Sequence, residues 1–418
     1  MADDHAAVAQ AMSVGARIGG ASMVVTLVSI AHAMSHAYGA LLPLIVPFFV
    51  TDLQLTYTQL GLIFSVSNLV WSPLQLGFGV LGRYCSRRLL LGIGNMCQAA
   101  AIIGTSLVHG FADLLSWRVI ARIADAPQHP IGNSLISQCF RVDRRGLALA
   151  INAAGSNLGT VAVPLIGGFL IATLGWRTTL VLFGLPGLLI GLLLVCLLEE
   201  HRGETHREQG AAKIGAEVWA LLRHRDALLL LTSHVIGAGG RGLGVATIYV
   251  PLYLSQSLGV DEVQLGILLT IMMVGSVVGP LIAGPLSDRV GRKPVLFADY
   301  AIACLCFAGL LTVGSSGSSW ALPAVLTVTG IAVYSEGALM QTALADVADR
   351  TSMDMLFGLY FTVGAAIGAP WAVLIGVLVD GYGFAAAFIA MAASQVLAAL
   401  VLLPVRLRRT LHAAPGHS

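Results

Sequence analysis

The segment 113–140 carries the densest set of side chains that could do chemistry within an otherwise apolar stretch. Arg118, Arg122, Asp125 and His129 recur there at helical spacing and fall within about 60° of arc on one face. An arginine held away from water offers a planar fork to a carboxylate or phosphonate. The spacing therefore predicts an anion-binding stripe, although Arg122 and Asp125 could instead form an i,i+3 pair that only fixes helix packing.

A second group of candidate residues lies in the segment 21–50, where His32 and His36 stand one helical turn apart. Imidazoles change charge near neutral pH, so a pair on one face could carry protons. The alternative is that both rings only make structural hydrogen bonds.

The rest of the chain adds isolated polar residues to apolar segments. Arg241 lies in a glycine-rich stretch, Glu336 could carry a proton or pair with an arginine, and Asn68 and Tyr334 are further cavity candidates. These side chains could equally join helix to helix. The three buried arginines outnumber Asp125 and Glu336, which favours an anionic or zwitterionic substrate.

The composition explains why buried charges stand out. Only 11% of the 418 residues are Asp, Glu, Lys or Arg, whereas 57% are hydrophobic, and an ordinary soluble domain has about 25% charged residues. This excludes a soluble enzyme, a disordered chain and a secreted disulfide scaffold. The formal net charge of +2 argues against a nucleic-acid partner.

The elements that must position these residues are membrane-spanning helices. A helix needs about 20 apolar residues to cross a bilayer, and the sequence predicts an all-α polytopic membrane protein with twelve such helices. The expected spans are 21–50, 57–81, 89–109, 113–140, 146–173, 177–198, 227–257, 262–286, 294–314, 320–347, 355–379 and 382–404.

Basic residues predict the orientation of these spans. Of 23 Lys and Arg, 18 fall in even-numbered connections or the C-terminal tail. Because positive charges favour the cytoplasmic side, we expect a multi-pass protein of the inner membrane with both termini cytoplasmic. The expected parts are a tail 1–20, a six-helix bundle 21–198, a linker 199–226, a second bundle 227–404 and a tail 405–418. The linker could be an amphipathic helix on the membrane or a solvated connection.

The two halves of the chain contain matching segments. Gln59-Leu60-Gly61 recurs as Gln264-Leu265-Gly266 at an offset of 205 residues, and Gly79-Val80-Leu81 recurs as Gly284-Pro285-Leu286 at the same offset. Three glycines at 155, 159 and 167 recur at an offset of 209. Such a repeat predicts two pseudo-symmetric bundles, an architecture typical of transporters.

The run from Gly284 to Lys293 resembles the signature of the major facilitator superfamily, and the resemblance extends over essentially the whole chain. It implies a fold of two six-helix bundles and transport by alternating access. Asp288 at a helix end beside basic residues could act as a conformational latch, or these charges could only set the topology. The latch residues that match are Gly284, Asp288, Arg289, Gly291 and Arg292. The N-terminal copy of the signature has Arg83 where the acid is expected.

Gly155, Gly159, Pro164 and Gly167 are similar to a fifth-helix signature of proton-coupled antiporters, or they could serve packing alone. The positions of His32, His36 and His129 are similar to those of histidines in the fosmidomycin-resistance branch of the superfamily. This resemblance implies efflux of drugs or organic anions. We expect proton-coupled efflux of a small organic anion or zwitterion. The alternative is a proton-coupled or facilitated importer of a small carboxylate.

The sequence contains no motif typical of an enzyme and no Walker A loop for ATP. We therefore expect no enzymatic activity, no cofactor and no metal. The expected partners are a small-molecule substrate, protons and the lipid bilayer, and we expect a monomer without a nucleic-acid partner.

Overall fold

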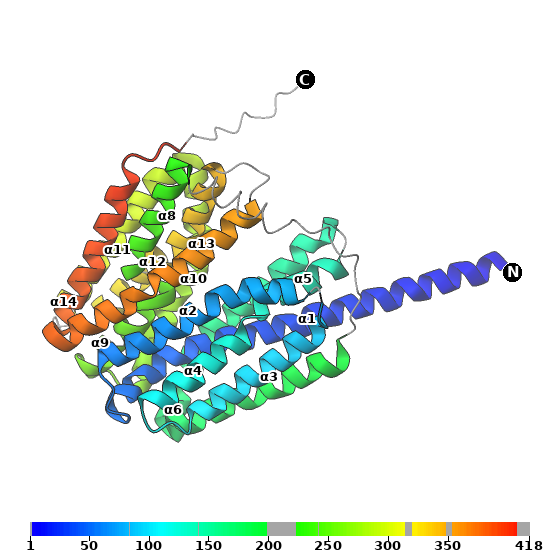
Figure 1. The fold of residues 1–418 in the computed structure, drawn as a ribbon, viewed down its shortest axis with the longest axis horizontal. Helices are drawn as coiled ribbons and strands as arrows, with labels where there is room; N and C mark the ends of the chain where they lie inside the picture. The colour runs from blue at the N-terminus through cyan, green and yellow to red at the C-terminus, as the bar shows by residue number, and fades with distance from the viewer. Residues whose placement is uncertain are drawn as a thin grey trace. The chain divides into compact units, whose positions relative to one another are not determined.

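The computed structural model describes residues 2–82, 84–140, 142–198, 223–240, 242–313, 320–347 and 353–407, and within these ranges the secondary structure is helical (Figure 1). Two compact units divide the chain. Unit 1 comprises residues 1–42, 70–163 and 170–206, and unit 2 comprises residues 43–69, 164–169 and 207–418. Unit 2 therefore combines the second half of the sequence with two pieces of the first half.

The helices of the first half are α1 (Ala2–Thr51), α2 (Tyr57–Leu81), α3 (Arg87–Thr105), α4 (Phe111–Asp125), α5 (Gln128–Cys139) and α6 (Val142–Leu197). A core in unit 1 joins α1, α3, α5 and α6 through buried aliphatic side chains such as Val28, Leu91, Ile136 and Leu194. This core fixes α1 against α5, which matters for the histidines on both helices.

The second half contains α8 (Arg225–Gly237), the 3-10 turn η1 (Ala238–Gly240), the π-helical turn η2 (Gly242–Ala246), α9 (Thr247–Gln256), α10 (Glu262–Val290), α11 (Arg292–Val313), α12 (Ala321–Val347), α13 (Met353–Gly368) and α14 (Pro370–Leu402). Their core includes Leu231, Leu296, Tyr300, Met340 and Ala398. The glycine-rich stretch after Gly237 interrupts the helix, because consecutive glycines weaken α-helical geometry.

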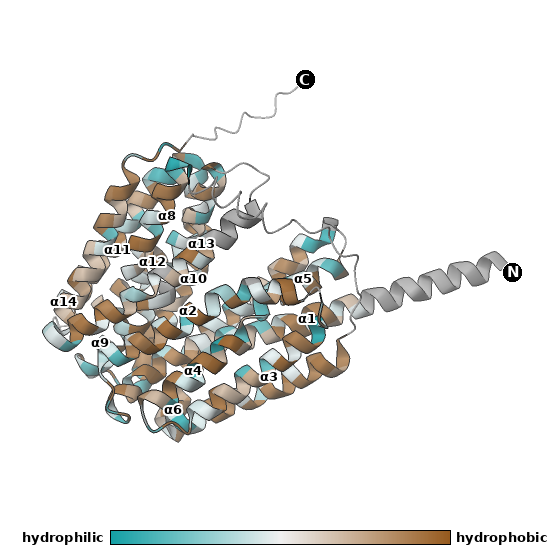
Figure 2. Ribbon diagram, in the orientation of Figure 1, coloured by the Kyte–Doolittle hydropathy of each residue, from teal (hydrophilic) through white to brown (hydrophobic). Residues whose placement is uncertain are grey.

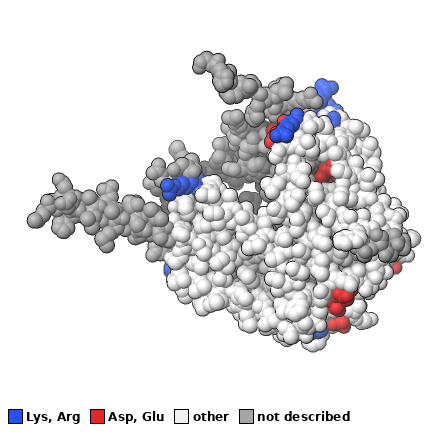
Figure 3. All heavy atoms as spheres, turned by 180° about the vertical axis from the view of Figure 1, so that it is seen from behind, with Lys and Arg blue, Asp and Glu red and all other residues white. Residues whose placement is uncertain are grey.

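The helices are apolar along most of their length (Figure 2), and in the described residues eight helical runs are long and apolar enough to cross a membrane. Large apolar side chains such as Phe169, Leu281 and Leu305 are exposed, and one whole face carries few charges (Figure 3). Exposed apolar surface with internally bonded helical backbone is what lipid requires.

The described helices do not match the twelve predicted spans one to one, because some neighbouring spans are joined and others are divided. The spans 146–173 and 177–198 form α6, which is interrupted where Gly175 has a φ of 77°. An equivalent break in α14 lies at Gly383, with a φ of 78°. Glycine tolerates a positive φ without steric cost, so each break allows a sharp turn between two spans.

Other predicted boundaries also differ. The helix α1 starts at Ala2, so residues 2–20 continue the helix of the first predicted span. The predicted span 113–140 is divided into α4 and α5 around Pro127, because proline cannot donate a backbone hydrogen bond. Most of the predicted linker, residues 199–222, and most of the C-terminal tail, residues 408–418, lie outside the described part.

The internal repeat is present in the packing as well as in the sequence. Glycines of α6 lie against α1, and the glycines at the same repeat positions of α13 lie against α8 and η1. The four contacts are Gly155 on Ser29, Gly159 on Ala33, Gly364 on His234 and Gly368 on Ala238. The contacted residues are related by the offset of 205 and the glycines by the offset of 209. Both halves thus bury the same small-residue stripe, and small residues allow close approach of helices.

Candidate functional site

Unit 1 contains a charged cluster at the end of α4. Arg122 Nη1 lies 3.2 Å from Asp125 Oδ2, which is the i,i+3 pair considered from the sequence. Arg118 is 9% exposed, and both Arg122 and Asp125 are close enough to interact with it electrostatically. Among the described residues, two guanidinium groups therefore accompany one carboxylate in this cluster.

Asp125 joins the α4 cluster to two other helices. Its Oδ1 accepts a hydrogen bond from Gln98 Nε2 of α3 at 3.1 Å and another from the hydroxyl of Ser35 of α1. These bonds satisfy a carboxylate that is only 4% exposed. Because a buried charge is costly without partners, Asp125 holds three helices in one arrangement.

Arg122 also packs against an aromatic ring. Its guanidinium carbon lies 4.0 Å from the ring centroid of Trp71 on α2, at cation–π distance. Trp71 in turn lies edge-on to His129, with ring centroids 6.2 Å apart. The arginine cluster and the histidine of α5 therefore share one aromatic neighbour.

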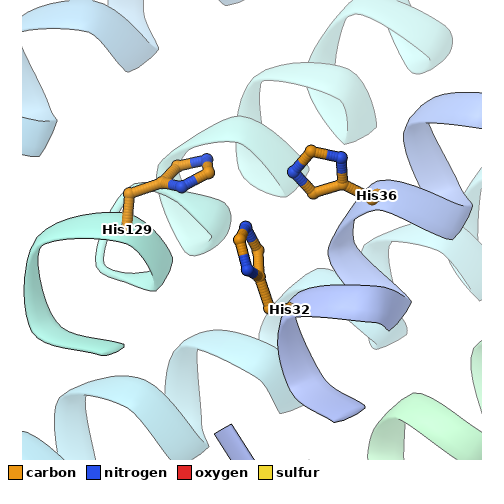
Figure 4. Close-up of side chains that lie close together, drawn as sticks. All are labelled: His32, His36 and His129. Atoms are coloured by element: carbon orange, nitrogen blue, oxygen red, sulfur yellow. The ribbon is translucent and has the colours of Figure 1, made fainter. Parts of the chain in front are cut away.

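The structure brings His129 together with His32 and His36, from which it is separated by more than ninety residues of sequence. His32 and His36 project from α1 and His129 projects from α5, and their rings converge (Figure 4). The ring centroids lie 4.8 Å apart for His32 and His36, 5.0 Å for His32 and His129, and 6.0 Å for His36 and His129. The predicted histidine pair is thus part of a triad.

Unit 2 contains a second buried polar cluster, centred on Glu336 of α12. His234 Nδ1 of α8 lies 3.2 Å from Glu336 Oε1, and the hydroxyl of Tyr300 donates to the same oxygen at 3.4 Å. Glu336 is 4% exposed and shares a small pocket with Asp299 of α11, which is 8% exposed. Glu336 thus pairs with a histidine of α8.

Some functional candidates were missed by sequence reasoning. Asp299 was a detectable one, because it is an acid within the apolar span 294–314. Ser35, Gln98 and Tyr300 carried no such signal, since uncharged polar residues are common in membrane helices.

The remaining predicted cavity residues are dispersed. Arg241 lies outside the described residues. Asn68 lies on α2, three residues before Trp71. Tyr334 precedes Glu336 by two residues on α12, so the two side chains lie on different faces.

The signature loop between α10 and α11 differs in detail from the predicted latch. Asp288, whose side chain is 60% exposed, pairs with Arg292 on the following turn at 2.5 Å. Arg292 makes the connection to another helix, because its Nε donates to Asp346 Oδ2 of α12 at 3.1 Å. Gly291 ends α10 with a φ of 108°, a conformation that favours glycine.

Two residues of the signature, Gly284 and Arg289, lie in open surroundings. A Cβ at Gly284 would meet no atom within 4 Å, so this glycine does not allow two helices to touch. Arg289 is exposed. The fifth-helix residues pack closely instead: Gly155 and Gly159 contact α1, the Pro164 carbonyl contacts Gly266, and Gly167 is buried.

Comparisons with known proteins agree with this architecture. The family model described as Major Facilitator Superfamily matches residues 27–372 and, in a second match, 230–417. A "Hexuronate transporter" of Bacillus subtilis is 23% identical over 394 residues, covering 91% of this chain and 93% of the relative. A "Probable L-galactonate transporter" of Escherichia coli is 26% identical and covers 58% of this chain and 57% of the relative.

Solved structures share the fold. The nucleoside transporter NupG has a TM-score of 0.75 at 13% identity, covering 91% of this chain and 98% of that one. A bacterial homologue of the human lysosomal transporter Spinster, in an inward-facing and unoccupied conformation, has a TM-score of 0.71 at 16% identity, covering 92% and 95%. These relatives do not support the narrower drug-efflux branch expected from the sequence.

Proposed function

Because the chain belongs to the Major Facilitator Superfamily, a family of membrane transporters and not of enzymes, we propose that it imports a small organic anion of the sugar-acid class. The observation that carries the proposal is the pair of arginines on α4, Arg118 and Arg122, which among the described residues share their cluster with the carboxylate of Asp125 alone. The excess positive charge favours an anionic substrate, and a guanidinium fork matches a carboxylate geometrically.

We assign Arg118 to substrate binding because it is the more deeply buried arginine of the two, so a bound carboxylate would be better shielded from water there. Arg122 contacts Asp125 and the face of Trp71, and we assign it to shaping the site. Arg118 lies one turn away on the same face of α4. Binding of a carboxylate there would add a counter-charge to a cluster that has a surplus cation.

The names of two relatives support an acidic sugar as the substrate. Hexuronate and galactonate each carry one carboxylate and several hydroxyls, and the B. subtilis relative covers almost the whole chain. The glycine pattern of α6 supported the efflux interpretation. In this structure those glycines contact α1 closely, which is sufficient to explain them by packing.

Proton coupling is assigned to the Glu336 cluster of unit 2. Two buried carboxyl groups, Asp299 and Glu336, share a pocket, and the imidazole of His234 pairs with Glu336. Both acids cannot be ionised there without a net negative charge in a desolvated site. Uptake and release of one proton would relieve that charge, and the bond between Glu336 and His234 would change with it.

The test is uptake of radiolabelled glucuronate into right-side-out proteoliposomes under an imposed inward proton gradient. We expect accumulation that an uncoupler abolishes. Arg118→Ala should reduce uptake about ten- to hundred-fold, the loss expected for a charge-assisted hydrogen bond, whereas Arg118→Lys should recover part of it. Arg177→Ala is the matched control, because this arginine of the same unit stacks on Trp176 and donates to the carbonyl of Val108.

Two results would overturn the proposal. Wild-type uptake by folded Arg118→Ala protein would remove the arginine from binding. The second result is that no uptake occurs in the first assay, whereas preloaded vesicles lose glucuronate when the proton gradient is reversed. This result would favour the efflux interpretation. Glu336→Gln should separate coupling from binding, because we expect it to retain exchange of labelled for unlabelled glucuronate while it loses gradient-driven accumulation.

A further inference from the structure

The three converging histidines of unit 1 form a ligand set that the transport proposal does not use. One ring nitrogen from each of His32, His36 and His129 lies within 4.8 Å of the others. Around a tetrahedral zinc ion, with bonds of about 2.0–2.1 Å, nitrogen ligands stand roughly 3.3 Å apart. Small side-chain rotations would therefore bring the three nitrogens onto one ion.

The hydrogen bonds around His36 leave one of its nitrogens available. The hydroxyl of Thr160 donates its single proton to the carbonyl of Ser156 at 3.1 Å. Its oxygen can therefore only accept from His36 Nδ1, which lies 3.2 Å away. With the proton on Nδ1, Nε2 carries a lone pair, and a bond from the second nitrogen to a fixed acceptor is the usual support of a metal-ligating histidine.

His32 is the most deeply buried member of the triad, at 7% exposure. Neither of its ring nitrogens makes a hydrogen bond of ordinary geometry with another described residue. Asn152 of α6 lies near enough to interact with the ring, and its Oδ1 also lacks a partner there. A buried imidazole costs free energy unless both nitrogens are satisfied, and a metal ion on one nitrogen with Asn152 on the other would satisfy both.

We propose that His32, His36 and His129 together bind one divalent transition-metal ion of the zinc class, with its fourth coordination position open to an oxygen ligand. Imidazole ligands select zinc, copper, nickel and related ions over magnesium and calcium, which prefer oxygen. Three histidines with one open position form a coordination set known for zinc. The carboxylate of Asp125 lies close enough to attract all three rings electrostatically, and this attraction opposes the repulsion that Arg122 exerts on His36 and His129.

The test is titration of Co²⁺ into the full-length protein in detergent, purified through a tag without histidine. We expect one equivalent to produce the intense visible absorption of a tetrahedral cobalt ion, and Zn²⁺ but not Mg²⁺ to displace it. His36→Asn and His129→Asn should each lose this absorption. His109→Asn, at an exposed histidine just before α4, should keep it.

A second measurement keeps the proposal falsifiable if a variant folds poorly. Zn²⁺ should raise the unfolding temperature of the wild-type protein and of His109→Asn, and it should leave that of folded His36→Asn and His129→Asn unchanged. Absence of tetrahedral absorption in the wild-type protein, or its persistence in a folded variant lacking His36 and His129, would overturn the proposal. Glucuronate uptake by metal-free protein would leave the transport proposal intact, so the two proposals fail independently.

Discussion

The carboxylate of Asp380 on α14 caps the N-terminus of α2 through Thr58. Its Oδ2 accepts the backbone N–H of Thr58 at 2.8 Å and the Thr58 hydroxyl at 2.5 Å, and its Oδ1 accepts the N–H of Tyr57 at 3.0 Å. Thr56 and Gln59 already form a reciprocal capping box at this helix end. Asp380 thus adds a cap from a residue 322 positions away and joins the two halves of the sequence within unit 2.

Replacement of Asp380 by Asn should weaken this joint. We expect loss of about 1 kcal/mol, typical of a helix cap, and a change in the rate of substrate exchange because the bond must break whenever α2 and α14 separate. Asp261→Asn is the matched control, since Asp261 caps only its own helix α10 through Gln264. Equal effects of both variants on exchange, measured in proteoliposomes, would assign Asp380 to stability alone.

Arg292→Ala should slow the transport cycle more than Asp288→Asn. Arg292 bridges Asp288, Ser287 and Asp346 and so joins α10, α11 and α12, whereas Asp288 is mostly exposed and pairs with Arg292 across the connection between α10 and α11. Substrate affinity should change little in either variant. The measurement is the maximal uptake rate beside the binding constant for glucuronate, and a larger rate loss in Asp288→Asn would restore the original latch assignment.

Gly159→Ala should destabilise unit 1 by about 1–3 kcal/mol, the usual cost of overpacking. A Cβ there would clash with the carbonyl of Ala33, a backbone atom that cannot rotate away. Gly39→Ala is the control, because its Cβ would meet nothing within 4 Å. Thermal unfolding in detergent compares them, and an unchanged midpoint for Gly159→Ala would show that α1 and α6 can move apart freely.

Asp125→Ala should destabilise the protein more than the double variant Asp125→Ala/Arg122→Ala. The single change leaves the Arg122 guanidinium without its ionic partner at 3.2 Å, and breaking a buried pair costs about 3–5 kcal/mol. Removing both charges avoids that penalty. The coupling energy is obtained from the free energies of unfolding of the wild-type protein, the two single variants and the double variant. If the losses in the single variants add up to the loss in the double variant, the pair contributes no net interaction.

The sequence was sufficient to predict the helical membrane fold, because the hydropathy of a segment and the spacing of its glycines are local properties. They decide whether that segment is stable as a helix in lipid. The repeat offsets of 205 and 209 residues predicted which glycines occupy equivalent positions in the two halves, and the equivalent glycines contact α1 in one half and α8 and η1 in the other. The i,i+3 spacing also placed Arg122 beside Asp125. Such relationships need only helical geometry within one segment or symmetry between two.

The partners of these residues depended on the tertiary structure. Nothing in the sequence indicates that Gln98 and Ser35 bind Asp125, or that His234 lies against Glu336. The break at Pro127 separates His129 from the regular stripe of α4, and the packing of α5 on α1 then directs it to His32 and His36.

The sequence by itself therefore determined that this chain is a multi-helix transporter with a few buried charges, because the cost of charge in lipid makes each one conspicuous. Only the tertiary structure decided which of those groups meet. Contacts between helices depend on the rotation and depth of each helix in the bundle, and a linear pattern of apolar residues leaves both undetermined.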